Sequence, residues 1–295
     1  MDLEKAVELI ESSPDYRIIR KLAPVEQYFA DDASEKRIGI YLDVETTGMD
    51  AEEDTIIEIA LVPFEFNKVG QIFKVLPAYN AFQDPGIPIP EVITRITGIT
   101  DDMVKGQSLD LDKIHHLLND AAIVIAHNAK FDRGFCENLD DSFKDISWAC
   151  SIADINWNEE GIEGVKLEYL AYKYGFFYEG HRATIDCYAA LHILANTLPT
   201  SGELVLKRLL DTARKSTIRI WAVNAPFDKK DDLKARKYRW SDGSNGSKKA
   251  WYIDIAEDNF DEEKIYLKDN IYTNKMPDLP TLKITAQKRY SPTLK

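Results

Sequence analysis

Four acidic residues and one histidine in this 295-residue chain are of the types that metal-ion chemistry needs. Asp43 and Glu45 lie two residues apart, Asp132 lies in a later stretch, and His181 precedes Asp186 by five residues. Carboxylates that are removed from water need a cation as partner. All-oxygen ligands suit Mg²⁺ or Mn²⁺, and a histidine beside such ions can accept a proton. These residues therefore predict a metal site with a proton acceptor, provided that the fold brings them together.

The first two carboxylates are predicted to point the same way from one strand. Residues 37–45 read as a β-strand, and its side chains alternate between two faces. Asp43 and Glu45 share one face, and the other face is formed by Ile38, Ile40, Leu42 and Val44. This apolar character predicts a central, buried strand, and no Lys or Arg lies near Asp43 and Glu45 in sequence. A divalent metal is therefore the natural partner, although an exposed sheet face also tolerates such a pair of acids.

Asp132 is predicted to lie in the first turn of a helix over residues 129–139, directly after a short buried strand at 122–126. Functional sites of α/β folds gather where strands end and helices begin. An acidic residue in a first turn also complements the helix dipole, so this position taken alone has an ordinary structural explanation.

His181 and Asp186 can serve one site only if they do not share a helix. At about 100° per residue, side chains five apart on a helix diverge by roughly 140°. The sequence therefore places His181 in the loop before a helix over residues 183–198, and Gly180 fits such a loop. Asp186 then lies in the first turns of this helix and faces inward.

The order of the elements predicts a mixed sheet flanked by helices. Strands at 38–45 and 56–62 and a third after the turn near 67–70 indicate an antiparallel meander. Helical and strand patterns then alternate up to residue 198, which is typical of an α/β domain.

The composition indicates a soluble cytoplasmic protein. No apolar run approaches the roughly 18 residues of a membrane helix, and the acidic N-terminus lacks a signal-peptide pattern. Cys136, Cys150 and Cys187 are far apart and form no CxxC pair, so neither a zinc site nor a disulfide is expected. We therefore expect no membrane partner.

The charge divides the chain unevenly. Residues 1–200 hold 17 Lys and Arg against 36 Asp and Glu, a net charge of −19, whereas residues 201–295 hold 20 against 14, a net charge of +6. This split predicts three parts. They are a helical arm and linker at 1–36, the domain with the acidic residues at 37–200, and a small basic, aromatic α+β module at 201–295.

The motifs as a set resemble the DEDDh family of 3′–5′ exonucleases, which includes the proofreading epsilon subunit of bacterial DNA polymerase III. The first motif is D-V-E at 43–45, the second is H-N-A-K-F-D at 127–132, and the third is H-R-A-T-I-D at 181–186. The stretch I-T-G-I-T at 96–100 matches a loop common in the family. The resemblance covers about residues 37–200 and implies an RNase-H-like fold.

The resemblance also implies roles for single residues. Asp43, Glu45, Asp132 and Asp186 would hold two divalent ions, Mg²⁺ or Mn²⁺, and His181 would act as the general base. Further residues would contact the terminal nucleotide: Thr46, Gly48, Met49, His127, Asn128 and Phe131. Asn128 has an alternative role as a helix cap and Phe131 as a core residue.

The expected activity is therefore hydrolysis of nucleotides from the 3′ end of single-stranded DNA. Two alternatives stay open: a 3′–5′ exoribonuclease that trims RNA, and a non-catalytic nucleic-acid- or polymerase-binding module. Association with a polymerase also stays open. Aromatic residues are interleaved with basic ones in the segment 229–252, which suits single-stranded nucleic acid. The alternative for this module is a solvated basic surface with Trp240 and Trp251 in its own core.

Overall fold

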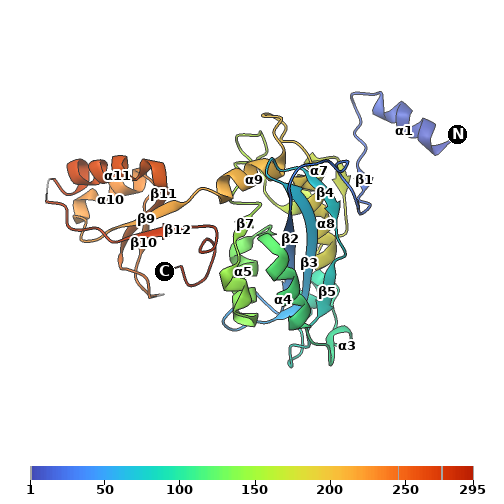
Figure 1. Ribbon diagram of the computed structural model, residues 1–295, viewed down its shortest axis with the longest axis horizontal. Helices are drawn as coiled ribbons and strands as arrows, with labels where there is room; N and C mark the ends of the chain where they lie inside the picture. The colour runs from blue at the N-terminus through green and yellow to red at the C-terminus, as the bar shows by residue number, and fades with distance from the viewer. Residues whose placement is uncertain (1, 245, 274, 295) are drawn as a thin grey trace.

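The computed structural model describes residues 2–244, 246–273 and 275–294. It consists of a larger body built around one sheet, a smaller C-terminal module at one side, and a helix at the N-terminus that projects from the other side (Figure 1). No helix in the described part of the chain is both long and apolar enough to cross a membrane.

The central sheet of the body is mixed, as the sequence predicts. Its strands run in the order β4-β3-β2-β6-β7, and β5 also pairs with β3. Strands β2, β3, β4 and β5 pair antiparallel, whereas β2, β6 and β7 run parallel. The bounds are β2 (Lys36–Thr46), β3 (Ile56–Asn67), β4 (Ile72–Val75), β5 (Tyr79–Phe82), β6 (Ala121–Ala126) and β7 (Trp148–Cys150).

Both faces of this sheet are covered by helices. Tyr41 and Ile125 face the core formed with α7 (Leu167–Lys173), α8 (Ala183–Leu194) and α9 (Val205–Ala213). Ile40 and Leu42 face the opposite core, which includes residues of α4 (Leu111–Asp120) and α5 (Ala129–Leu139). Because side chains alternate along a strand, Asp43 and Glu45 share the α8 side with Tyr41. The shorter elements of the body are β1 (Arg20–Lys21), α2 (Glu91–Thr97), α3 (Asp101–Val104), α6 (Ser142–Asp145) and β8 (Phe176–Phe177).

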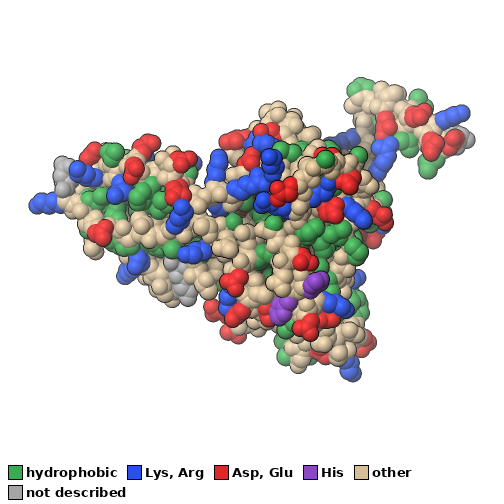
Figure 2. Space-filling model, in the orientation of Figure 1, with side chains coloured by type: hydrophobic (Ala, Val, Ile, Leu, Met, Phe, Trp, Pro, Cys, Tyr) green, Lys and Arg blue, Asp and Glu red, His purple; other side chains and the backbone are tan. Residues whose placement is uncertain are grey.

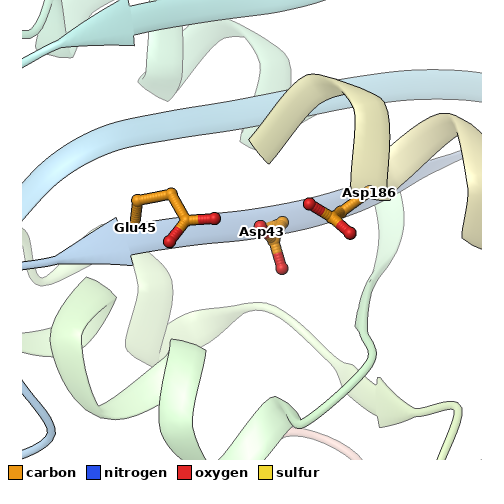
Figure 3. Close-up of side chains that lie close together, drawn as sticks. All are labelled: Asp43, Glu45 and Asp186. Carbon is orange, nitrogen blue, oxygen red and sulfur yellow. The ribbon is translucent and has the colours of Figure 1, made fainter. Parts of the chain in front are cut away.

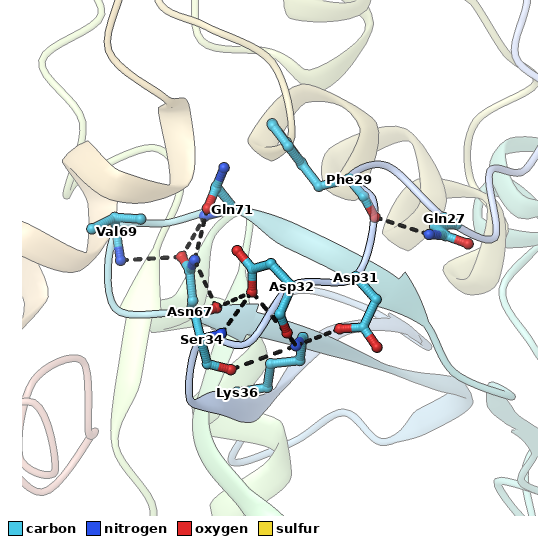
Figure 4. A network of polar contacts seen from close by, with 9 residues as sticks. All are labelled: Gln27, Phe29, Asp31, Asp32, Ser34, Lys36, Asn67, Val69 and Gln71. Carbon is cyan, nitrogen blue, oxygen red and sulfur yellow. Dashed lines mark hydrogen bonds and ion pairs between the residues drawn. The ribbon is translucent and has the colours of Figure 1, made fainter.

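The N-terminal arm is held to the body from Arg17 onward. Helix α1 (Leu3–Glu11) has no buried residue, so it is not packed on the body. Residues 20–21 pair with β8, and residues 31–36 are fixed by a polar network (Figure 4). In that network Lys36 pairs with Asp31 at 2.5 Å, and Asn67 donates to Ser34 at 3.3 Å. The predicted linker is therefore tied to the turn after β3.

The C-terminal module is an α+β unit with its own sheet and core. The strands run in the order β10-β11-β9-β12, all antiparallel, and the buried side chains include Ile220, Leu233, Tyr238 and Ile271. The strands are β9 (Thr217–Ala222), β10 (Arg239–Ser241), β11 (Ala250–Ala256) and β12 (Thr281–Ile284). The helical segments are η1 (Phe227–Lys229), α10 (Lys230–Ala235), η2 (Glu257–Asn259), α11 (Phe260–Tyr266) and η3 (Leu267–Ile271).

Two segments beyond residue 200 belong to the body. Helix α9 contributes Val205, Leu206, Leu209, Leu210 and Ala213 to the larger core. The last residues return to the body, where the Trp148 amide donates to Ala286 O at 2.9 Å. The buried Arg133 donates to Gln287 O and Arg289 O, each at 2.7 Å. The body core therefore extends to Ala213, and the segment at 286–291 joins the module to α5 and β7.

Candidate active site

Three of the predicted carboxylates meet at one point of the body. Asp43 and Glu45 project from β2 and Asp186 projects from α8, and one carboxylate oxygen of each lies within 4.8 Å of the others (Figure 3). The strand period puts the first two on the face that α8 covers. Asp186 meets them because α8 packs across β2 and β3 at its first turns.

The electrostatics of this cluster favour a cation. Burial, together with repulsion by the neighbouring carboxylates, raises the pKa of Glu45 to about 8 and the pKa of Asp43 well above its usual range. Burial also raises the pKa of Asp186 to about 6. Three hard oxygen donors that destabilise one another when ionised are suited to Mg²⁺ or Mn²⁺. The donor set therefore fits the metals expected from the sequence.

Asp132 lies beside this trio but is not part of it. It is 3% exposed in the first turn of α5, which begins where β6 ends. Burial raises its pKa to about 7, against a partial lowering by backbone hydrogen bonds. Its charge contributes to raising the pKa of Asp43, so the two carboxylates lie near each other. The side chain thus borders the site from the helix that the sequence predicts.

His181 lies in the loop directly before α8, as the angle between side chains five residues apart on a helix predicts. Its backbone has φ of 65°, a left-handed conformation that is uncommon for a residue other than glycine. The side chain is about half exposed, and its Nε2 is 3.9 Å from Oε1 of Glu168. The imidazole is thus accessible at the edge of the trio.

A fifth acidic residue, Glu58, belongs to the site and is missing from the sequence prediction. It is fully buried on β3, opposite Glu45 in the strand register. Arg182 donates to it from Nε at 3.1 Å and from Nη2 at 2.9 Å, and the Ala183 amide donates at 3.2 Å. The available signal was a single charge inside the apolar run I-I-E-I-A-L-V at 56–62.

The loop after β2 lies next to the trio. Thr46 Oγ1 donates to Gly48 O at 2.5 Å. A Cβ at Gly48 would lie 2.4 Å from Oδ2 of Asp54, so a larger residue would have to displace this carboxylate from its bonds to Thr47 and Asp50. Met49 is 79% exposed, which leaves its side chain available for contact with a ligand.

The three residues around the start of α5 that the sequence predicts to contact the nucleotide differ in how free their side chains are to bind a ligand. Both ring nitrogens of His127 are bonded inside the protein, Nδ1 to Ser151 Oγ at 2.8 Å and Nε2 to Val165 O at 2.7 Å. Asn128 is exposed at the N-cap position and makes no side-chain cap hydrogen bond in the described structure. Phe131 is half buried and packs on Phe135 at 4.9 Å. Asn128 and Phe131 thus present free surface, whereas His127 ties two loops together.

Comparison with known proteins adds a family to this geometry. The family model described as Exonuclease (RNase_T) matches residues 40–194. The PolC-type DNA polymerase III of Lacticaseibacillus paracasei is 39% identical over 101 residues, which is 34% of this chain and 7% of that protein. The PolC-type polymerase of Clostridium perfringens is 32% identical over 200 residues, 60% of this chain and 13% of that protein. The chain thus spans a small fraction of the length of these relatives.

A solved structure confirms the fold. The zinc-bound complex of E. coli exonuclease I with single-stranded DNA aligns with a TM-score of 0.52 and 16% identity, over 81% of this chain and 72% of that one. This likeness agrees with the mixed sheet and helices described above. Because the family model matches more than half of the chain, the chain belongs to the exonuclease family.

Proposed function

We propose that this protein is a metal-dependent 3′–5′ exonuclease that removes nucleotides from the 3′ end of single-stranded DNA. The observation that carries the proposal is the trio of Asp43, Glu45 and Asp186, because one carboxylate oxygen of each lies within 4.8 Å of the others. Membership of the exonuclease family supports a phosphodiester hydrolase. The structural neighbour exonuclease I of E. coli forms a complex with single-stranded DNA, which supports the choice of substrate.

The carboxylates would hold two divalent ions, Mg²⁺ or Mn²⁺. Asp43, Glu45 and Asp186 supply converging oxygens, and Asp132 supplies a fourth carboxylate from α5. Bound ions would neutralise the trio, lower the pKa of a bound water and stabilise charge on the phosphate. Because the carboxyl pKa values are raised, the chain must release protons when it binds these ions.

His181 would take the proton from the attacking water. Its imidazole is accessible at the mouth of the site, and the loop that carries it is fixed by the pair of Arg182 with Glu58. A general base of this kind contributes about 10²–10⁴ in rate. Glu168, at 3.9 Å, is placed to orient the ring.

The terminal nucleotide would lie between two exposed groups of side chains. Met49, with Thr46 and Gly48 behind it, would contact it from the loop after β2, and Asn128 and Phe131 from the start of α5. A half-buried phenylalanine offers a face for stacking on a base.

The test is hydrolysis of single-stranded oligonucleotides by the purified protein. With Mg²⁺ or Mn²⁺, a 5′-labelled DNA strand should shorten stepwise from its 3′ end, and a 3′ label should be released as a mononucleotide. EDTA should stop both. A matched RNA strand run in parallel reports the sugar preference.

Three results would overturn the proposal. No hydrolysis by folded protein with either metal would favour a non-catalytic binding module. Shortening of RNA but not of DNA would make the protein an exoribonuclease. Release of the 5′ label before the strand shortens from its 3′ end would show that hydrolysis starts at the 5′ end.

A further inference from the structure

A large cleft lies between the body and the C-terminal module. Its volume is about 940 Å³, and its walls come from the start of α5, the segment after α9, the sheet of the module and the C-terminal segment. Figure 2 shows the module as a separate lobe beside the body. None of the roles proposed above uses this cleft.

The cleft opens at the same edge of the sheet as the acidic trio. Strands β2, β6 and β7 are parallel, so their carboxyl ends meet at one edge, and Asp43 and Glu45 lie at that end of β2. Lys130 lines the cleft and precedes Asp132 by two residues on α5. Ala153 and Asp154, just after β7, line it as well. A strand with its 3′ end at the trio can therefore continue along this edge into the cleft.

The lining is positive. Five cations line the cleft against three carboxylates. They are Lys130, Lys215, Arg219, Arg239 and Arg289 against Asp154, Asp242 and Asp254. Lys130 and Lys215 are exposed and make no ion pair within the described residues. The positive lining contrasts with the net charge of −19 on residues 1–200, which repels a polyanion from the rest of the body.

Two of the arginines are fixed in place. Arg219 donates to Asp254 at 2.7 and 2.9 Å, and Arg239 donates to the same carboxylate at 3.1 Å. Both guanidinium groups also lie over the ring of Tyr252, at 4.9 and 4.8 Å from its centroid. One carboxylate shared by two guanidinium groups leaves net positive charge, and preorganised guanidinium groups suit phosphate.

The cleft also offers an aromatic face. Trp240 lines it and is 51% exposed on the edge strand β10. The ring is held edge-on by Trp251, its register partner, at 5.5 Å between centroids. A base can stack on a tryptophan fixed in this way, whatever its sequence.

We infer that this cleft binds the single strand behind its 3′ end, with phosphates on Lys130, Lys215 and the paired arginines and a base on Trp240. The inference rests on the proposed function, since it takes its direction from a 3′ end at the trio. It assigns binding to the face of the module that lines the cleft. Lys234 and Phe227 are exposed on the same module but do not line the cleft.

The experiment compares two double variants with matched chemistry. Lys215→Gln with Trp240→Ala removes one cation and one aromatic ring from the cleft. Lys234→Gln with Phe227→Ala removes the same groups outside it. Binding to a labelled oligothymidylate of about 20 nucleotides, longer than the 4–16 that a typical single-strand site covers, is measured by fluorescence anisotropy in Ca²⁺ at several salt concentrations. Hydrolysis of a dinucleotide in Mg²⁺, too short to reach the cleft, is measured on each protein.

The cleft variant should bind the long strand about 5- to 150-fold more weakly, as the loss of one stacked base predicts. Its salt slope should fall by about 0.7, as for one lost phosphate contact. The single variant Lys215→Gln, at an exposed site, should show the same change of slope with a smaller loss of affinity, because it keeps the Trp240 ring. The control variant should match the unmodified protein, and all proteins should cut the dinucleotide equally.

Equal long-strand binding by all variants would overturn the inference while leaving the proposed function intact, provided that the dinucleotide is cut. Equal weakening by the cleft and control variants would overturn it too, because the module would then act only through its total charge. If the unmodified protein does not cut the dinucleotide in Mg²⁺, the proposed function fails instead.

Discussion

Arg182 binds the buried Glu58 through two side-chain hydrogen bonds, at 3.1 and 2.9 Å, and so links the loop of His181 to the strand beside β2. The Ala183 amide, at the first residue of α8, donates to the same carboxylate. One buried group therefore fixes both the left-handed His181 and the start of the helix that carries Asp186. A backbone conformation of this kind costs on the order of 1–3 kcal/mol and persists where its surroundings hold it.

Glu58→Gln should therefore slow hydrolysis without touching a metal ligand. A neutral amide cannot accept two charge-assisted bonds from Arg182, so the loop should lose its fixed geometry. We expect kcat to fall about 10- to 100-fold with little change in KM, as for outer-shell partners of metal sites. Glu65→Gln, on the same strand, is the control. An unchanged kcat in a folded Glu58→Gln protein would show that the pair has no positioning role.

Asp43→Asn should abolish turnover and leave the fold intact. The amide removes one charged oxygen from the metal site, and several kcal/mol of phosphate stabilisation with it, so the rate should fall by more than about 10³-fold. Asp112→Asn, exposed on α4, gives the same change of charge and should have no effect. Near-normal rates in folded Asp43→Asn would rule out the proposed metal site.

The metal-free protein should become less stable as the pH rises from 5.5 to 8.5. Glu45, Asp132 and Asp186 have pKa values of about 8, 7 and 6, above the value of about 4 in an unfolded chain. In this window the folded state binds more protons than the unfolded state, so the free energy of unfolding falls as the pH rises through these values.

Thermal unfolding in EDTA at the two pH values tests this. Tm should drop by an amount on the order of a few degrees, and saturating Mg²⁺ should reduce the drop because the ion replaces the protons. Asp43→Asn, with one repelling charge fewer, should show a flatter dependence. If Tm in EDTA rises with pH to the same extent in the unmodified protein and in Asp43→Asn, the carboxylates of the site do not control the pH dependence of stability.

His181→Ala should reduce the single-turnover rate by about 10²–10⁴ while metal binding is retained. His116→Ala, at an exposed histidine on α4, is the matched control. Metal affinity, measured by calorimetry with Mn²⁺, should be unchanged in both variants. If the rate of His181→Ala equals that of the control, another group takes the proton.

Arg289→Met should destabilise the protein without slowing hydrolysis of a dinucleotide. The buried Arg289 contacts Asp154 at 3.4 Å and the backbone oxygens of Thr212 and Lys215. Its loss removes the hydrogen bonds that these oxygens accept and the cation beside the buried Asp154, at about 1–3 kcal/mol, so Tm should fall by several degrees. Lys288→Met, at the exposed neighbour, should leave Tm unchanged. Equal Tm values for the two variants would show that this contact does not hold the module to the body.

The sequence by itself determined the mixed sheet, the strand that carries Asp43 and Glu45, and the loop position of His181. These follow from local rules, because the period of a strand or a helix fixes which side chains share a face. Strands β9 and β12 were not predicted, although Ile218, Ile220 and Ala222 alternate along β9. Their pairing partners lie far along the chain, and pairing decides whether such short segments become strands.

Only the tertiary structure decided which groups meet. It paired Glu58 with Arg182 and gave both ring nitrogens of His127 a hydrogen-bond partner inside the protein. It also brought Lys130 and Trp240 into the lining of one cleft. The same stretch of basic and aromatic residues contains Tyr238 in the core of the module and Trp240 half exposed. The reason is physical: burial and ion pairing depend on the packing of segments far apart in sequence, which local periodicity does not encode.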